Sequence, residues 1–169
     1  KVMSQNITIL QIDQNPGNWI SQFLTSNNQT ITNGNGLYVI GAAAGRIATS
    51  TNGTTWSLKN SGTTSAINKL TYGNAVYIAV GAGGLVLTST DATTWTSRTS
   101  AADNNWTSVC WGINTGLFIV VSNTGTNNRV MVSSNGINWR FYYSLPNNNW
   151  NSIIWCEELN VYVAIASAG

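Results

Sequence analysis

Few side chains in this sequence can do acid–base or nucleophilic chemistry. The chain has no histidine, which excludes a Ser-His-Asp triad, a histidine general base and a histidine-ligated metal. A glycosidase needs two carboxylates roughly 5–10 Å apart across one bond, and the sequence assembles no such pair, because Glu157 and Glu158 are adjacent on a predicted turn. The carboxylates are Asp13, Asp91, Asp103, Glu157 and Glu158. We therefore predict no catalytic residue, no metal and no cofactor, and so a protein that is not an enzyme.

The cysteines and the charge exclude further classes. Cys110 and Cys156 are too few ligands for a structural zinc site, and we favour two buried thiols over a disulfide. Seven Lys+Arg against five Asp+Glu give a net charge of +2, and charged residues are only 7% of the 169. A nucleic acid needs clustered cations, and a membrane span needs roughly 20 apolar residues in a row. The sequence predicts neither partner.

A repeated segment is the strongest signal in the sequence. Three stretches follow the pattern Ser-[ST]-[ND]-[GA]-x-[TN]-Trp, and their tryptophans are 39 and 44 residues apart. Residues 31–56 also align with 70–95 without a gap, and 12 of those 26 positions are identical. The pattern residues are Ser50, Asn52, Gly53 and Trp56, then Ser89, Asp91 and Trp95, then Ser133, Asn135, Gly136 and Trp139. A weaker copy, residues 13–19, ends 37 residues before Trp56.

Each repeat predicts four short strands. In the second unit the strands are expected at 67–72, 76–80, 85–89 and 94–98, separated by Gly, Asn and Asp at the turns. Four strands in about 40 residues is typical of a β-propeller blade. A β-sandwich is the alternative, but its strands would not recur with such self-similarity. We predict an all-β protein, a β-propeller of four-stranded antiparallel blades.

The repeat resembles the Asp-box, or BNR-type, repeat of sialidase-like propellers, although its Ser-to-Trp spacing is one residue shorter and Asn usually replaces Asp. In that family the box lies between the third and fourth strands and is structural. The stretches 150–153 and 161–164 are also similar to repeats of large-virus, phage and bacterial surface proteins. The resemblance implies an extracellular, virion or cell-surface location. None of the four arginines, Arg46, Arg98, Arg129 and Arg140, has the sequence context of sialidase arginines.

The units predict a single domain over residues 1–169. It contains a half-blade at 7–26, blades at 29–61, 66–100 and 106–145, and a half-blade at 150–166. We expect the two halves to form one composite closing blade, giving about four blades and hiding the strand edges. Two alternatives remain open. The chain is part of a larger propeller, or two chains join their half-blades in an eight-bladed homo-oligomer.

Aromatic and amide side chains are the candidate ligand contacts. Sugars stack on exposed aromatic rings and pair with amides, and the sequence has 24 asparagines. The candidates are Trp106, Trp111, Trp150, Trp155, Asn104, Asn105, Asn148 and Asn149. The alternative is that these tryptophans pack the inner blades and that the asparagines are solvated turns. We predict separately that Trp56, Trp95 and Trp139 are core or inter-blade residues. We predict a lectin-like recognition module for a glycan or protein partner. A structural component of a virion or surface appendage is the second hypothesis, and a sialidase-like hydrolase a remote third.

Overall fold

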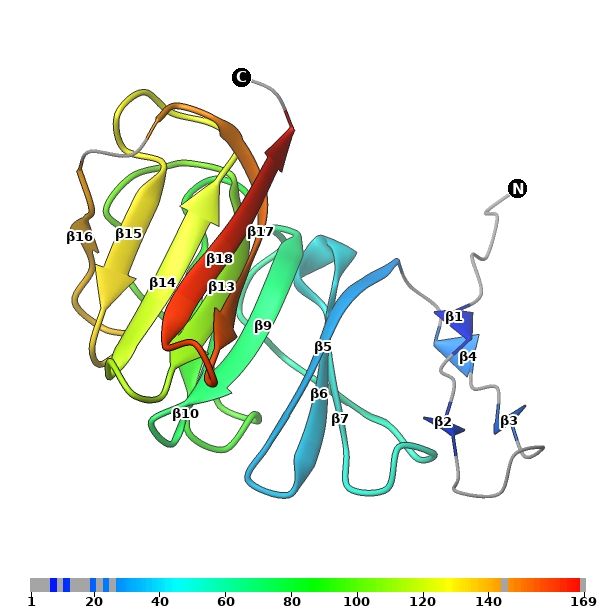
Figure 1. Ribbon diagram of the computed structural model, residues 1–169. Coiled ribbons are helices and arrows are strands. Elements are labelled where there is room, and N and C mark those ends of the chain that lie inside the picture. The colour runs from blue at the N-terminus through cyan, green and yellow to red at the C-terminus, as the bar shows by residue number, and fades with distance from the viewer. Residues whose placement is uncertain are drawn as a thin grey trace.

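The computed structural model describes residues 7–8, 11–12, 19–20, 23–24, 27–143 and 146–167. Three four-stranded antiparallel sheets, which we call blades 1, 2 and 3, follow one another along the chain, and a two-stranded C-terminal hairpin follows blade 3 (Figure 1). In each blade the strands lie in chain order. The architecture confirms the predicted all-β fold of propeller blades. No helix among these described residues is long and apolar enough to cross a membrane.

The strands have the following bounds. Blade 1 contains β5 (Asn28–Gly34), β6 (Leu37–Ala42), β7 (Ile47–Ser50) and β8 (Ser57–Lys59), with a short 3-10 turn, η1 (Ala43–Gly45), before β7. Blade 2 contains β9 (Ile67–Gly73), β10 (Val76–Gly81), β11 (Val86–Ser89) and β12 (Thr96–Ser97). Blade 3 contains β13 (Trp106–Gly112), β14 (Leu117–Ser122), β15 (Val130–Ser133) and β16 (Arg140–Phe141). The C-terminal hairpin contains β17 (Asn149–Cys156) and β18 (Val161–Ser167).

Turn residues explain the hairpins between first and second strands. Asn35 and Gly36 join β5 to β6 with φ of 46° and 75°, and Asn74 and Ala75 join β9 to β10 with φ of 47° and 59°. Two successive positive φ values define the tight turn that matches the twist of the flanking strands, and Asn and Gly tolerate them best. The two turns therefore share one geometry, although the second one places Ala75 where glycine is favoured.

The first strands of successive units lie side by side (Figure 1) and are joined by side-chain hydrogen bonds. The amide N–H of Leu70 on β9 donates to Thr30 Oγ1 on β5 at 3.0 Å. Asn68 Nδ2 on β9 donates to the carbonyl of Trp106 on β13 at 2.8 Å, and Thr107 Oγ1 on β13 donates to the carbonyl of Trp150 on β17 at 2.7 Å. Each first strand is thus hydrogen-bonded to the next.

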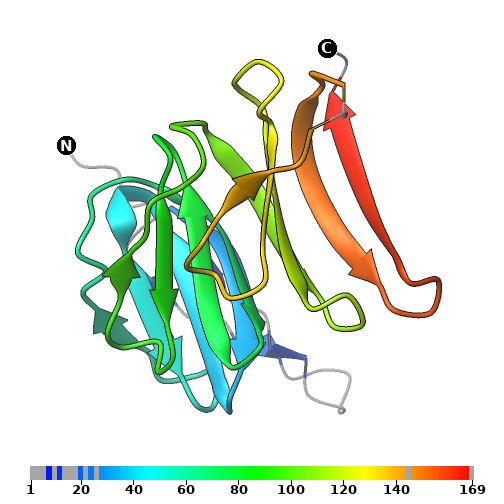
Figure 2. The ribbon, with the colours of Figure 1, turned by 90° about the vertical axis from the view of Figure 1, so that its left-hand side faces the viewer.

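Three apolar clusters lie between the units, which stack as separate layers with the C-terminal hairpin at one end (Figure 2). The first joins blades 1 and 2, with Val39 packing near Leu70 and Tyr77. The second joins blades 2 and 3 through residues such as Ile78 and Phe118. The third joins blade 3 to the C-terminal hairpin. The core is therefore divided among interfaces, each formed by two neighbouring sheets.

The loop between third and fourth strands, which we call the box turn, has the same hydrogen bonds in all three blades. One Asn or Asp Oδ1 accepts from the amides two and three residues later at 2.7–3.0 Å. The following tryptophan Nε1 donates to the carbonyl three residues before it at 3.0–3.2 Å. The acceptors are Asn52, Asp91 and Asn135, and the tryptophans Trp56, Trp95 and Trp139 are half-buried. The box turn is built by its own side chains.

The two half units do not form the expected composite blade among the described strands. At the N-terminal end β1 (Ile7–Thr8) pairs with β4 (Phe23–Leu24), and β2 (Gln11–Ile12) pairs with β3 (Trp19–Ile20). At the other end β17 pairs with β18 alone. The N-terminal strands lie beyond blade 1 and the C-terminal hairpin beyond blade 3 (Figure 1), so the chain forms an open arc. This arrangement agrees with the alternative of a partial propeller.

Candidate functional site

The four candidate tryptophans are packed to different degrees. Trp106 is fully buried, and its Nε1 donates to Ser100 Oγ at 3.3 Å, so it has no free face for a ligand. Trp111, Trp150 and Trp155 are half-buried against the apolar clusters. Because it is buried, Trp106 is no longer a candidate ligand contact, whereas the other three tryptophans are only half-buried.

The candidate asparagines hold the loops at one end of blade 3. Asn104 is buried, and its Nδ2 donates to the carbonyl of Asn128 at 2.8 Å. Asn105 Nδ2 donates to Asn123 Oδ1 at 2.9 Å, while Asn149 Oδ1 accepts from Arg129 Nη1 at 2.8 Å. The half-buried Asn148 offers its carbonyl to the Trp150 amide at 2.9 Å. Three of these amide groups are therefore already engaged in the protein.

The ionisable groups are also committed to structure. Backbone amides of Thr94 and Thr93, with the Ser89 hydroxyl, lower the pKa of Asp91 to about 2, because all of them donate to its carboxylate. Cys110 and Cys156 are free thiols, and burial raises the pKa of Cys110 to about 12. Within the part of the chain that the structure describes, no three Cys, Asp or Glu side chains gather as metal ligands do.

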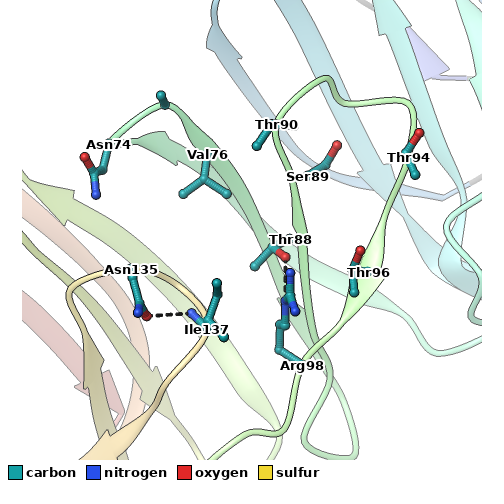
Figure 3. A pocket seen from close by; sticks show the side chains of 11 residues that line it. Asn74, Val76, Thr88, Ser89, Thr90, Thr94, Thr96, Arg98, Asn135 and Ile137 are labelled. Atoms are coloured by element: carbon teal, nitrogen blue, oxygen red, sulfur yellow. Dashed lines mark hydrogen bonds between the residues drawn. The ribbon is translucent and has the colours of Figure 1, made fainter.

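A groove lies between the outer part of blade 2 and the box turn of blade 3 (Figure 3). Its volume is about 420 Å³. Blade 2 contributes hydroxyl side chains from β11, the box turn and β12, together with the β9–β10 turn, and blade 3 contributes Asn135 and Ile137. The blade 2 residues are Asn74, Ala75, Val76, Thr88, Ser89, Thr90, Thr94, Thr96 and Arg98. The groove is therefore rich in hydroxyl groups and has one cationic side chain.

Arg98 is the central charged group of the groove (Figure 3). It follows β12, and its amide donates to the carbonyl of Val86 at 2.9 Å, which continues the strand ladder. Its Nε donates to Oγ1 of the buried Thr88 at 2.9 Å. No partner of its two terminal amino groups is found among the residues that the structure describes. The guanidinium is thus oriented by Thr88 and keeps donors for a ligand.

Sequence reasoning weighed Arg98 only as a sialidase arginine and missed this groove. The signal was present in the repeat, because Lys59 occupies the equivalent position of blade 1, 39 residues earlier. Lys59 Nζ bonds to the neighbouring Ser57 hydroxyl at 3.2 Å. Spacing places both cations at the end of a fourth strand, but it does not show that the next blade's box turn closes a groove over Arg98.

Comparison with known proteins supports the fold. No protein-family model matches the chain, and no curated protein matches it. Among solved structures, YCF48 bound to D1 peptide superposes with a TM-score of 0.66 at 12% identity, covering 90% of this chain and 52% of that one. The computationally designed Ika4 protein gives 0.65 at 13%, covering 98% and 94%, and YCF48 from Cyanidioschyzon merolae gives 0.57 at 12%, covering 82% and 50%.

The fold class follows from the blades and these superpositions together. YCF48 is a β-propeller, and this chain spans about half of the length of either YCF48 chain. The protein is therefore an all-β chain with the fold of a partial β-propeller.

Proposed function

We propose that this protein is a non-enzymatic recognition module whose blade 2–blade 3 groove binds a carbohydrate, with preference for one that carries an acidic group. The observation that carries the proposal is the Arg98 guanidinium, held by Thr88 at 2.9 Å in a groove lined by hydroxyl side chains. Sugars are recognised by hydrogen bonds to such groups, and a planar guanidinium suits a carboxylate.

The size of the groove fits a small ligand. Its volume of about 420 Å³ lies in the roughly 300–1,000 Å³ of small-molecule sites. Thr90 and Thr96 each supply a hydroxyl that can donate or accept, whereas the Ser89 hydroxyl already donates to Asp91 Oδ1 at 2.9 Å. Aromatic stacking plays a smaller part in this proposal than the sequence suggested, because Trp106 is buried.

Binding rather than catalysis is favoured by the chemistry of the lining. No carboxylate, cysteine or histidine lines the groove, so its described residues offer hydrogen bonds and one positive charge. The nearest box-turn carboxylate, Asp91, already accepts two backbone amides at 2.7 and 2.8 Å. A general acid or base is thus missing from the proposed site.

A protein segment with an acidic side chain is a second candidate ligand. One structural neighbour is YCF48 bound to a peptide. The Arg98 guanidinium would bind a peptide carboxylate by the same fork of donors. A separate candidate role is that of an assembly component of a virion or surface appendage, which the open ends of the arc favour. An extracellular or surface location stays a prediction.

The test is an array of neutral and acidic glycans probed with the intact chain and with Arg98→Ala. Wild type should bind acidic glycans, and Arg98→Ala should lose roughly tenfold to hundredfold in affinity, the range expected for one charged hydrogen-bonding group. Lys59→Ala is the matched control, since it removes the equivalent cation of blade 1, and it should bind like wild type. Binding to acidic peptides instead would favour the second candidate. Arg98→Ala binding as tightly as wild type would refute the groove.

A further inference from the structure

The C-terminal hairpin exposes an apolar face that is covered in every complete pair of blades. Ile154, Val163 and Ile165 are 59%, 46% and 63% exposed. Each unit has an aromatic pair between its first and second strands: Trp155 with Tyr162, Trp111 with Phe118, and Tyr72 with Tyr77. Tyr162, Phe118 and Tyr77 are therefore equivalent positions on the second strands. By that register Val163 and Ile165 correspond to Ile78 and Val80 of blade 2, which are both fully buried against blade 3. The hairpin therefore lacks a neighbour on this face.

Blade 1 exposes the complementary face at the opposite end of the arc. Ile31 and Tyr38 are 53% and 43% exposed. Their equivalents by the 39-residue repeat are Leu70 and Tyr77, which are 2% and 0% exposed because blade 1 covers them. The two ends of the arc thus present the two halves of one inter-blade interface, each without its partner.

A third feature lies between blade 3 and the hairpin. A cavity of about 340 Å³ there is lined by apolar and aromatic side chains, among them Val130, Trp150 and Tyr162. At the equivalent blade 2–blade 3 interface, Met131 from a third strand and Trp139 after a box turn complete the packing. The C-terminal hairpin has only first and second strands, and the outer edge of β18 is unpaired among the described strands. Among the described strands, this unit is therefore without a third strand.

The N-terminal strands have the pairing of third and fourth strands. Gln11 pairs with Ile20 and Ile7 with Leu24, antiparallel on either side of the weak box at 13–19, as third and fourth strands do. Relative to the box, their register is shifted by one residue from that of blade 1, where Thr49 pairs with Ser57. They lie at the blade 1 end, away from β18 (Figure 1). They are therefore poorly placed to complete the hairpin of their own chain, and well placed to complete that of a chain docked on blade 1.

We propose that the occupant of these faces is a second copy of this chain. The C-terminal hairpin of each copy packs on blade 1 of the other, with β18 paired to the other copy's N-terminal strands. The curvature supports two copies, because the arc superposes on about half of a YCF48 propeller chain, as half of a ring would. Two such joints close a ring of about eight blades and leave no open edge.

The test is the mass of the full chain in solution by native mass spectrometry and light scattering. At micromolar concentration we expect twice the 18.1 kDa of one chain. Ile165→Lys and Tyr38→Lys should each give a monomer, with the dissociation constant raised roughly hundredfold, because either change alters both joints. Ile113→Lys is the matched control: Ile113 is 59% exposed, lies in the β13–β14 turn outside both faces, and its variant should stay dimeric.

Several results would overturn the proposal. A wild-type monomer would overturn it. Protection of the β18 amides from hydrogen exchange in that monomer would indicate closure by its own N-terminal strands, and free exchange would indicate an open edge. A mass above that of the dimer would show an open polymer. Unchanged dimers of Ile165→Lys and Tyr38→Lys would place the interface elsewhere. Circular dichroism of each variant confirms folding, and since both side chains are exposed in the single chain, neither substitution should unfold it.

Discussion

Trp106→Phe tests how much of the stability depends on the packing between blades 2 and 3. Trp106 is fully buried and donates to Ser100 Oγ. A phenyl ring is about 40 Å³ smaller than an indole, and at about 24 cal/mol per Å³ the cavity costs about 1 kcal/mol. The lost hydrogen bond adds about 1 kcal/mol, and the lost burial of ring atoms about 0.5 kcal/mol. We expect the free energy of unfolding to fall by about 2–3 kcal/mol.

Trp150→Phe is the matched comparison. Trp150 is the equivalent residue 44 positions later, half-buried, and its buried Nε1 has no hydrogen-bond partner among the described residues. Removing that donor relieves a desolvation cost of about 1–3 kcal/mol, which offsets the smaller ring. We expect a net change within about 1 kcal/mol of zero.

Urea unfolding at one fixed protein concentration, followed by circular dichroism, measures both variants. Each kcal/mol corresponds to about 2–4 °C in Tm for a chain of this size, so a thermal scan should separate them by several degrees. Equal losses in the two variants would refute the reasoning, because they would show that neither burial nor the indole hydrogen bond distinguishes the two sites.

Three further predictions concern the box turn and the cysteines. The pKa of Asp91 is lowered to about 2 from 3.8, so its contribution to stability is complete above about pH 5 and is lost as the pH falls toward 2. Wild type should lose more Tm over that window than Asp91→Asn. Gly136→Ala should lower the free energy of unfolding, measured in urea, by roughly 2–4 kcal/mol, because φ is +72° and a Cβ would lie 2.7 Å from a blade 2 side chain. Gly83→Ala is the control: its φ is +64° but a Cβ would meet open space, so the loss should be about 1 kcal/mol. Cys110 is buried with a pKa raised to about 12, so iodoacetamide should modify Cys156 first in the native protein, and equal rates would contradict this.

The repeat made the blades predictable from the sequence. Asn35-Gly36 is a sequence typical of a tight turn, and the recurring Ser-to-Trp stretch marks the loop between third and fourth strands. These signals are local, because the side chains that build each turn bond within three residues of one another. Local chemistry is what a single sequence reports best.

The relations between blades were less predictable. Trp106 and Trp150 stand at equivalent positions, yet one is fully buried and the other is not, because burial depends on the sheet on either side. The groove around Arg98 needs the box turn of the next blade, and the open ends depend on how far each blade rotates from the last. Neither rotation nor inter-blade distance has a signature in strand periodicity.

The side-chain bonds that join successive first strands have a consequence for unfolding. Thr30, Asn68 and Thr107 each connect one unit to its immediate neighbour. In such a nearest-neighbour array the cooperativity is short-ranged, as in a one-dimensional chain of coupled units. Blades 2 and 3 each have a coupled neighbour on both sides, so the free chain should fray from its ends toward these two blades, whose amides should exchange last.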